Sequence, residues 1–395
     1  MVYHQIKIAV AEKQIASAGK AVGIACKLSA ACSEGGLHIV RRLEFSDGDT
    51  WIARVQKTPA SSDSYKRLLH EVCTIRVIQQ RSNIPVPRTV ACCTAEDNPV
   101  GAAFTIQQYV HADTGMNVLG EDFPKKLLMT PGWEERYYGA MARIQAEISS
   151  VHFPMIGCIT ETSDGYSVGP IPGIGGPFET PADFFAQWAT GAVFPLSKEK
   201  VEQRTPPEYF EEVWKSIVGF PSQIAEFAKS YNFREGPFPV IHGDLYRSNI
   251  LIDNDCNVKA IIDWETAIVA PWELVEFIKD LGVVLAVMNG TSYQEPPSVR
   301  ERRDKQRTYI KYVEKTEEKQ LLDGTLSSVL GDSAVQDFAR AFWLWHDGKP
   351  HTKQFGVKSE EDERAQTSSL NTIWYLPPCP NPERAIRDRP YDAVK

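Results

Sequence analysis

The sequence is poor in the features that mark membrane, secreted or nucleic-acid-binding proteins. No stretch approaches the roughly 18 consecutive apolar residues that a membrane-spanning helix needs. The first residues lack an apolar core followed by a small-residue cleavage site, so they predict no secretory signal. A net charge of −8 disfavours a nucleic-acid partner, because phosphate binding usually requires a basic excess. We therefore expect a cytoplasmic protein with no membrane or nucleic-acid partner; its oligomeric state is left open.

Cysteine motifs are missing as well. The eight cysteines are scattered along the chain and show no CxxC spacing. The sequence therefore predicts neither a zinc site nor a disulfide framework. Isolated cysteines among apolar neighbours are typical of small buried side chains in a reducing compartment, which agrees with a cytoplasmic location.

The first part of the chain is rich in strand-forming sequence. At 395 residues the chain is long for one domain, so we expect two lobes. Residues 35–45 and 50–56 are rich in β-branched and aromatic side chains and are split by a turn, which predicts a hairpin. A further strand is expected over 102–110, and the first lobe is expected to end near His111. Residues 1–34 are weakly patterned and are expected to be partly helical.

The second part has helical periodicity. Segments 135–151, 299–320 and 335–348 predict helices, of which the second is strongly charged and the third aromatic. Residues 160–180 are rich in Gly, Pro and Ser and predict a loop. Strands first and helices afterwards predict an α+β protein. Its expected parts are a first lobe at 1–111, a helical lobe at 112–350 and a loosely ordered extension at 351–395.

A polar cluster interrupts the apolar segment VIHGDLYRSNILID. His242, Asp244 and Asn249 follow one predicted strand, and the next two short strands predict a hairpin around the turn NDCN. If the hairpin folds symmetrically about Cys256, Asn249 lies opposite Asp263, where Asp244 also arrives. Two carboxylates and an amide oxygen at one place are ligands that Mg²⁺ prefers. The sequence therefore predicts a cation site at the open end of this hairpin.

The same segment carries a family resemblance. HGDLYRSNIL followed by IIDWE resembles the catalytic loop and metal-binding segment of the aminoglycoside phosphotransferase and choline kinase branch of the protein-kinase-like fold. The wider run from Gly35 to Leu281, which includes DGDTWIARV and GGPFETPADFF, is most similar to the fungal members. The resemblance implies two lobes, a small β-rich N-lobe and a large helical C-lobe. It also implies Mg²⁺-dependent transfer of the γ-phosphate of ATP to a hydroxyl of a small molecule.

The resemblance implies a role for each residue of the polar cluster. Asp244 accepts or orients the proton of the acceptor hydroxyl, and Asn249 and Asp263 hold Mg²⁺. His242 hydrogen-bonds within the loop and supports Asp263. The simpler alternative is a polar hairpin entrance whose histidine is satisfied.

A second group of residues is expected on the nucleotide side. Glu71 falls on the apolar face of its predicted helix, and burying an unpaired carboxylate costs several kcal/mol. Arg54 is the expected partner and matches the phosphate-binding cation of the family, with Arg in place of the kinase Lys. Ile52, on the same strand face, is implied to cover the adenine. The alternative is a surface arginine and a solvated Glu71, one helical turn out of phase.

The resemblance also implies backbone contacts to the nucleotide. Gln108, Tyr109 and Val110 occupy the expected hinge, where backbone groups bind adenine. Gly35 and Gly36 lie where a loop covers the phosphates, although two adjacent glycines are also typical of a plain turn.

The acceptor is expected to be a small molecule rather than a protein. After Asp263 the chain runs through TAIVAPWELVEF almost directly into an expected helix, which leaves no room for a peptide-binding activation segment. Glu265, Trp272 and Glu273 are candidates to line the acceptor pocket, since Trp and acids suit an amine-bearing molecule. The alternative is that the tryptophans are core and Glu273 begins a helix. A separate aromatic cluster is expected in the core and consists of Phe342, Trp343 and Trp345.

Other functions stay open at this point. A nucleotide-binding pseudoenzyme or regulatory protein could keep the fold and lose the chemistry, and the Arg at the Lys position favours that alternative. A protein kinase is opposed by the missing activation segment. The identity of the acceptor cannot be derived, because acceptor pockets of this fold are built from variable helices and loops.

Overall fold

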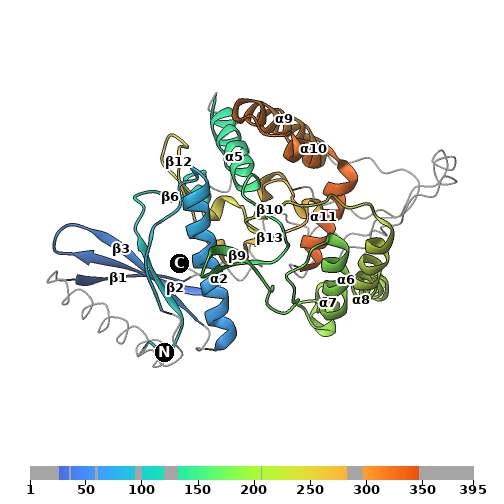
Figure 1. The fold of residues 1–395 in the computed structure, drawn as a ribbon, viewed down its shortest axis with the longest axis horizontal. Helices are drawn as coiled ribbons and strands as arrows, with labels where there is room; N and C mark the ends of the chain where they lie inside the picture. The colour runs from blue at the N-terminus through green and yellow to red at the C-terminus, as the bar shows by residue number, and fades with distance from the viewer. Residues whose placement is uncertain are drawn as a thin grey trace.

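The structure is a computed structural model that describes residues 26–34, 37–57, 61–93, 100–119, 132–205, 207–282 and 297–346. Figure 1 shows a β-rich lobe at one end of the long axis and a larger, mainly helical lobe at the other, with helix α2 (Ser62–Arg81) between them. The α+β class and the two-lobed architecture are therefore as expected. The predicted extension at 351–395 and the glycines at 35 and 36 lie outside the described residues.

The first lobe contains, among its described residues, one five-stranded sheet whose neighbours all run antiparallel. The expected hairpin is confirmed as its second and third strands, and the strand expected over 102–110 forms over a shorter range. In spatial order the strands are β1 (Cys26–Glu34), β2 (His38–Phe45), β3 (Thr50–Gln56), β5 (Phe104–Gln108) and β4 (Thr89–Cys93).

Strand β1 corrects the reading of the N-terminal segment. The residues 26–34 were expected to be weakly patterned and partly helical, but they pair with β2 along an edge of the sheet. Lys27, Cys32 and Ser33 are exposed. An edge strand with few buried side chains has no regular apolar alternation, so only pairing with its neighbour reveals it.

Helix α2 begins and ends where local chemistry dictates. Ser61 and Ser64 form a reciprocal capping box at the N-terminus. The helix ends at Arg81 with Ser82 as its C-cap, three residues before Pro85, and a proline restricts the residue ahead of it. The stripe containing Leu68 and Val72 is buried, as the helical period predicts. This stripe faces the rest of the molecule and carries one acid, Glu71.

The second lobe begins soon after the hinge. Strand β6 (Asp113–Thr114) pairs with β11 (Ile250–Ile252), which also pairs with β12 (Val258–Ile261). A second small sheet places β10 (Phe238–Ile241) between β13 (Ile268–Val269) and β7 (His152–Phe153). Residues 242–249, which we call the catalytic loop after the resemblance of their sequence, connect β10 to β11. Two sheets therefore hold the two ends of that loop.

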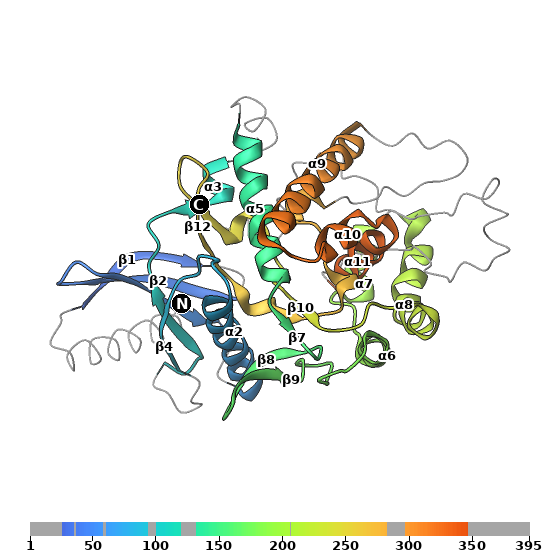
Figure 2. The ribbon, with the colours of Figure 1, turned by 45° about the horizontal axis from the view of Figure 1, so that its top comes forward.

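Helices form most of the second lobe (Figure 2). Three of them agree with the periodic segments of the sequence: α5 (Trp133–Ser149), α9 (Pro297–Gln320) and α11 (Ser333–His346). The other helices of the described residues are α3 (Gly115–Leu119), α6 (Pro181–Gly191), α7 (Lys198–Arg204), α8 (Pro207–Ser230) and α10 (Thr325–Gly331). No helix of the described residues is both long enough and apolar enough to cross a bilayer.

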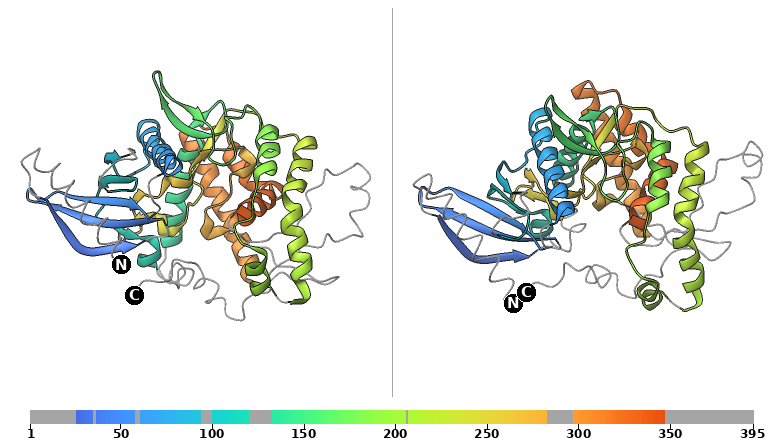
Figure 3. Two further views of the ribbon diagram at one scale, coloured as in Figure 1. Left: turned by 90° about the horizontal axis from the view of Figure 1, so that it is seen from below. Right: turned by 60° about the horizontal axis from the view of Figure 1, so that its bottom comes forward.

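Two local predictions in this lobe are wrong. Residues expected as a loop at 160–180 contain most of a hairpin, β8 (Cys158–Thr162) and β9 (Gly165–Gly169), which lies beside α2 (Figure 3). His70 of α2 contacts the carbonyl oxygen of Ile159 at 3.1 Å. Ile159 is fully buried, so tertiary packing outweighs a composition that is typical of loops.

The second error lies beyond Asp263. The expected helix does not form within 264–282, where the chain makes three short 3-10 turns instead: η2 (Trp264–Thr266), η3 (Trp272–Leu274) and η4 (Lys279–Leu281). Apolar side chains at 274, 275, 277, 278 and 281 are buried on more than one side. A nearly continuous apolar run of this kind gives no periodicity that distinguishes a helix from a buried irregular segment.

The aromatic helix α11 packs in the core, as expected. Phe342, Trp343 and Trp345 are 2%, 8% and 2% exposed. The indole N–H of Trp343 donates to the carbonyl oxygen of Leu274, and that of Trp345 donates to Ile217. Buried indoles with satisfied N–H groups are structural, so these rings form no substrate cage.

Candidate active site

The hairpin β11–β12 folds with a different register from the one the sequence suggests. Ile250 pairs with Ile261, and the backbone N–H of Ile262 donates to the carbonyl oxygen of Asn249 at 2.9 Å. Asn249 therefore lies opposite Ile262 and not opposite Asp263, which is one residue further along. The predicted symmetry about Cys256 is wrong by one position.

The turn of the hairpin explains the shift. Register slips by one residue between Leu251 and Ile252, which is a bulge. Cys256 adopts a left-handed conformation with φ of 63°, and Asp253 Oδ1 accepts the backbone N–H groups of Asp255 and Asn257. An aspartate that caps its own turn in this way selects the turn geometry, and the turn sets the register.

His242 links the catalytic loop to the end of β12. Its Nε2 contacts the carbonyl oxygen of Ile262 at 3.0 Å, and its Nδ1 lies 3.3 Å from the backbone nitrogen of Asp244. Burial lowers the pKa of His242 below its ordinary value, so the neutral ring carries its proton on Nε2 and accepts at Nδ1. The histidine therefore holds the backbone on both sides of the site: Asp244 directly, and Asp263 through the residue before it.

Gly243 shows why glycine stands between His242 and Asp244. Its φ is +77°, which L side chains rarely adopt. A Cβ atom there would lie 2.6 Å from the carbonyl oxygen of Thr266, whose hydroxyl donates to the carbonyl of His242. The loop thus lies directly against the turn that follows Asp263, and only glycine permits this approach.

Asp244 is held through both of its carboxylate oxygens. Oδ1 lies 3.0 Å from Nζ of Lys279, and Oδ2 accepts from Nδ2 of Asn249 at 2.9 Å. Burial opposes ionisation, but the Lys279 ammonium and the Asn249 hydrogen bond outweigh it and hold the pKa of Asp244 below its ordinary value. The Asn249 Nδ2 also donates to the Asp244 carbonyl, so its amide oxygen is turned away from Asp244.

A buried ion pair between Arg247 and Asp280 attaches the loop to the segment around η4, and it was not predicted from the sequence. Asp280 Oδ1 lies 3.4 Å from Nε of Arg247, and its Oδ2 accepts from the hydroxyl of Tyr137. Burial raises the pKa of Asp280 to about 6. The signal in the sequence is the pair Lys279–Asp280, which interrupts the apolar run ELVEFIKDLG and has no reason to be there in a plain core segment.

On the nucleotide side, Arg54 and Glu71 pair as the sequence predicts. Arg54 Nη1 lies 2.5 Å from Glu71 Oε1, and Nη2 lies 2.9 Å from Asp263 Oδ1. The Glu71 side chain is 1% exposed. Burial disfavours the charge on Arg54, but Glu71 and Asp263 outweigh it and raise the pKa of Arg54 above its ordinary value. The arginine thereby joins β3 and α2 of the first lobe to the end of β12 in the second.

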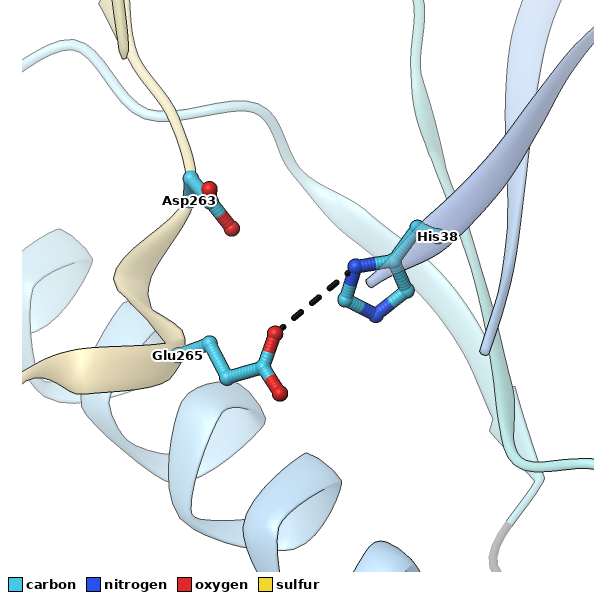
Figure 4. A group of neighbouring side chains, drawn as sticks. All are labelled: His38, Asp263 and Glu265. Atoms are coloured by element: carbon cyan, nitrogen blue, oxygen red, sulfur yellow. Dashed lines mark ion pairs between the residues drawn. The ribbon is translucent and has the colours of Figure 1, made fainter. Parts of the chain in front are cut away.

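His38 and Glu265 form a further contact across the lobes (Figure 4). His38 Nδ1 lies 3.7 Å from Glu265 Oε2, and one ligand atom from each of His38, Asp263 and Glu265 lies within 4.8 Å of the others. Burial, followed by Arg54 and Lys57, lowers the pKa of His38 to about 3. Burial, followed by Glu71 and Asp263, raises the pKa of Glu265 to about 7. The imidazole is therefore neutral, and the contact is not an ion pair.

Two of the three backbone N–H groups of the expected hinge are hydrogen-bonded within the protein. The backbone N–H of Gln108 donates to Arg88, and that of Tyr109 donates to Thr50. The N–H of Val110 has no acceptor among the described residues. Ile52 is partly buried on the same face of β3 as Arg54, because side chains two positions apart share a face.

The three predicted acceptor residues are not gathered in one place. Trp272 is 6% exposed and donates its indole N–H to the carbonyl oxygen of Pro237, while Glu273 is 2% exposed and accepts the backbone N–H of Arg234 at 2.8 Å. Burial raises the pKa of Glu273. Glu265 points instead toward His38 of the first lobe. These placements favour the alternative for Trp272, which is a core residue. Glu273 is buried as well, but it lies inside the 3-10 turn η3 and begins no helix.

The donor set at the hairpin end suits a hard divalent cation. Asn249 commits its amide nitrogen to Asp244, its amide oxygen accepts a long, 3.4 Å hydrogen bond from the Ser248 hydroxyl, and the Asp263 side chain is 39% exposed. Asp263 adopts a left-handed backbone, with φ of 67°, which aspartate tolerates better than most residues. Carboxylate and amide oxygens fit Mg²⁺, whereas a set that includes His38 would not, since Mg²⁺ prefers oxygen ligands.

Comparison with known proteins identifies the family. The phosphotransferase enzyme family (APH) matches residues 35–318. The match covers most of the chain, including both lobes and the whole site described above. The chain therefore belongs to the phosphotransferase enzyme family, and its two-lobed fold is protein-kinase-like.

Individual relatives are distant. Two subtelomeric hrmA-associated cluster proteins of Aspergillus fumigatus strains are 27% and 26% identical over 140 residues, which is 35% of this chain. The aligned part spans only 26% of each of those proteins. Among solved structures, aminoglycoside phosphotransferase APH(4)-Ia is 14% identical with a TM-score of 0.45, over 85% of this chain and 97% of that one.

A second solved structure gives a similar result. A type I macrolide 2'-phosphotransferase is 12% identical with a TM-score of 0.39, over 84% of this chain and 96% of that one. Because both scores are low, the assignment rests on the matched family model and not on either structure.

Proposed function

We propose that the protein transfers the γ-phosphate of ATP, with Mg²⁺, to a hydroxyl group of a small molecule. The observation that carries this proposal is the position of Asp244. It lies between Asn249 and Lys279 in a loop whose glycine, histidine and asparagine all have defined contacts. A polar hairpin entrance with only a structural role would not need a cation, in addition to the Asn249 amide, on a carboxylate that is 39% exposed.

The nucleotide is proposed to lie between the lobes. Arg54 would contact its phosphates, held in place by Glu71, and Ile52 would cover the adenine. The N–H of Val110, which has no acceptor in the part of the chain that the structure describes, would donate to the adenine ring, with Gln108 and Tyr109 fixing the hinge. Gly35 and Gly36 are proposed to lie over the phosphates. Planar arginine recognises phosphate oxygens through two N–H groups, so the phosphate contact differs from that of a lysine.

Asn249 and Asp263 are the residues proposed to hold Mg²⁺. A bound Mg²⁺ would neutralise the charge that develops on the phosphates. Asp244 would accept a hydrogen bond from the acceptor hydroxyl and receive its proton as transfer proceeds. His242 would keep Asp244 and the end of β12 at a fixed separation, because it contacts the backbone of both.

A small acceptor agrees with the chain after Asp263. Residues 264–282 are compact, with three 3-10 turns and a two-residue strand, and the buried Trp264, Trp272 and Leu274 attach this segment to the core. A peptide-binding surface would need a longer exposed segment there. Glu265 remains a candidate for substrate contact on the nucleotide side; Trp272 and Glu273 would support the pocket only indirectly.

One observation favours a non-catalytic nucleotide-binding protein as the second candidate. Arg54 already contacts Asp263, the acid proposed to hold the metal, at 2.9 Å. If that contact persisted when nucleotide is bound, the arginine would compete with the cation. Such a protein would bind ATP and release no ADP.

The test is ADP release by the purified protein with ATP and Mg²⁺, run against neutral, anionic and amine-bearing hydroxyl compounds. We expect release that depends on one class of acceptor and disappears in Asp244→Asn, which keeps the shape of the side chain. Tight ATP binding with no turnover on any acceptor would favour the second candidate. Absence of ATP binding would contradict the proposal.

A further inference from the structure

A lysine outside the family motif contacts the proposed catalytic base. Lys279 follows β13 and η3, and its Nζ lies 3.0 Å from Oδ1 of Asp244. The lysine side chain is 16% exposed. Asn249 contacts the other carboxylate oxygen, so the two partners approach Asp244 from different sides.

The backbone fixes the position of this lysine. The Lys279 N–H donates to the carbonyl oxygen of Leu245 at 3.1 Å, which ties the start of η4 to the catalytic loop. The next residue, Asp280, pairs with Arg247 of the same loop. Two adjacent residues therefore contact the loop on both sides of Tyr246, and this holds the backbone of Lys279 where its side chain reaches Asp244.

The same lobe contains an ordinary lysine–aspartate pair for comparison. At the closed end of the hairpin, Nζ of Lys259 lies 2.9 Å from Asp253 Oδ2, and the two side chains are 44% and 28% exposed. Exposed pairs of this kind contribute about 0–1 kcal/mol to stability. Lys279 differs because its partner is the group that must face the acceptor hydroxyl.

We propose that Lys279 is a catalytic residue whose ammonium group contacts the phosphoryl group during transfer. This proposal rests on the phosphotransferase function proposed above. The acceptor oxygen forms a bond to the γ-phosphorus, and the bond from phosphorus to the oxygen of the leaving ADP breaks with its electron pair on ADP. The hydroxyl proton passes to Asp244, and Lys279 stays protonated throughout.

The geometry supports contact with the phosphoryl oxygens. The acceptor oxygen would lie about 2.7 Å from Asp244 and about 3 Å from phosphorus before attack. An ammonium group at hydrogen-bond distance from the same carboxylate is then within reach of an equatorial phosphoryl oxygen, since the four-carbon lysine stem is flexible.

The positive charge of Lys279 is better explained by contact with the phosphoryl group than by contact with Asp244 alone. A cation beside Asp244 lowers its affinity for a proton and so weakens it as a proton acceptor. Phosphoryl transfer, however, passes through a loose transition state in which most of the charge lies on the three equatorial oxygens. A positive charge at this position therefore gains more by meeting the phosphoryl group than it loses by weakening the base.

The experiment compares a ground-state nucleotide with a mimic of the transferred phosphoryl group. Binding of Mg·AMP-PNP and of Mg·ADP with aluminium fluoride is measured by calorimetry for wild type, Lys279→Met, Lys279→Arg and the control Lys259→Met. We expect Lys279→Met to lose roughly 10²-fold in affinity for the fluoride complex, which is typical for removal of one donor to a transition-state charge. Its affinity for AMP-PNP should change less than about threefold, as expected if the contact forms only with the planar group.

The other variants decide between catalysis and simple stabilisation. Lys279→Arg should regain most of the fluoride affinity because it keeps the charge, and Lys259→Met should bind both ligands like wild type. If Lys279→Met loses affinity equally for both ligands, or loses none for either, the catalytic role of Lys279 is overturned. Nucleotide binding by wild type would in that case still support the proposed function. If wild type binds neither ligand, the proposed function itself fails. Thermal unfolding of each variant checks that it is folded.

Discussion

Two groups of charged side chains meet at the open end of the β11–β12 hairpin, and they differ in their balance of charge. On the nucleotide side, Arg54 contacts Glu71 and Asp263, and Glu265 lies beside Asp263 with neutral His38 as its partner. Acids outnumber the cations in contact with them. The raised pKa of Glu265 follows from burial and from its two acidic neighbours.

On the catalytic-loop side, each acid contacts its own cation. Lys279 meets Asp244, and Arg247 meets Asp280. These pairs connect neighbouring segments of one lobe, whereas the contact between Arg54 and Asp263 joins residues 209 positions apart, from the two lobes.

The difference indicates that the two groups have different roles. Arg54, Glu71, Asp263 and Glu265 form an acid-rich group, which can receive positive charge such as a metal-bound nucleotide would bring. Asp244, Lys279, Arg247 and Asp280 form a balanced group, which needs no further ion to be stable and can hold the loop in one conformation before substrate binds.

The largest effect is expected for Asp263→Asn. It removes the carboxylate that the acid-rich group offers to the cation, so Mg²⁺ should no longer tighten nucleotide binding. Nucleotide affinity measured with Mg²⁺ and with a chelator checks this. Asp253→Asn, at the closed end of the same hairpin, is the control and should keep the Mg²⁺ effect; an unchanged Mg²⁺ titration in Asp263→Asn would contradict the metal assignment.

Asp244→Asn is expected to lower acceptor-dependent turnover at least ~10²-fold, the lower range for loss of a general base. The nucleotide affinity should stay close to that of wild type, because the acid-rich group is intact. Steady-state kinetics together with a binding titration separate the two quantities. Turnover like that of wild type would remove Asp244 from the mechanism.

Glu71→Gln should destabilise the first lobe by about 1.5–3 kcal/mol, the usual worth of a hydrogen bond to a charged group. The matched control is the exposed pair between Arg76 of the same helix and Glu161 of β8, with side chains 41% and 54% exposed. Glu161→Gln should cost less than about 1 kcal/mol. Urea unfolding of both variants measures the difference, and equal losses would show that burial of the pair has no consequence.

The last prediction concerns the pH dependence of stability through Asp280. The pKa of Asp280 is raised to about 6, above its unfolded value, so the folded state holds this proton more tightly than the unfolded chain does. Its contribution to the free energy of unfolding is complete below about pH 4 and is lost as pH rises through about 6. Asp280→Asn cannot titrate there. The difference in unfolding free energy between wild type and variant should fall over that range, and a constant difference would refute the assignment.

Sequence reasoning worked where a short stretch of chain controls the outcome. The helical period identified Glu71 as a buried acid, and the strand pattern placed Arg54 where it could be the partner. The HGD and IIDWE segments indicated the catalytic loop and hairpin. The predicted register of the β11–β12 hairpin was still wrong by one residue, because the sequence has no clear signal for the bulge or for the left-handed backbone of Cys256.

It failed where several distant segments decide one environment. Trp272 and Glu273 look like pocket residues from their chemistry, yet the indole N–H of Trp272 donates to Pro237 and one carboxylate oxygen of Glu273 accepts from Arg234. The hairpin at 158–169 was hidden by loop-like composition. In both cases, packing partners that are remote in sequence set the burial of the side chain.

The sequence by itself determined the family, the two-lobed order of elements and the polar residues of the catalytic loop, because motifs and periodicity act over a few residues. Only the tertiary structure decided that Lys279 meets Asp244, that His38 meets Glu265 and that Arg54 reaches Asp263. Each of these contacts needs a backbone path through intervening elements to bring two side chains within a few ångströms. No local preference encodes that path, since it depends on how the two lobes pack against each other.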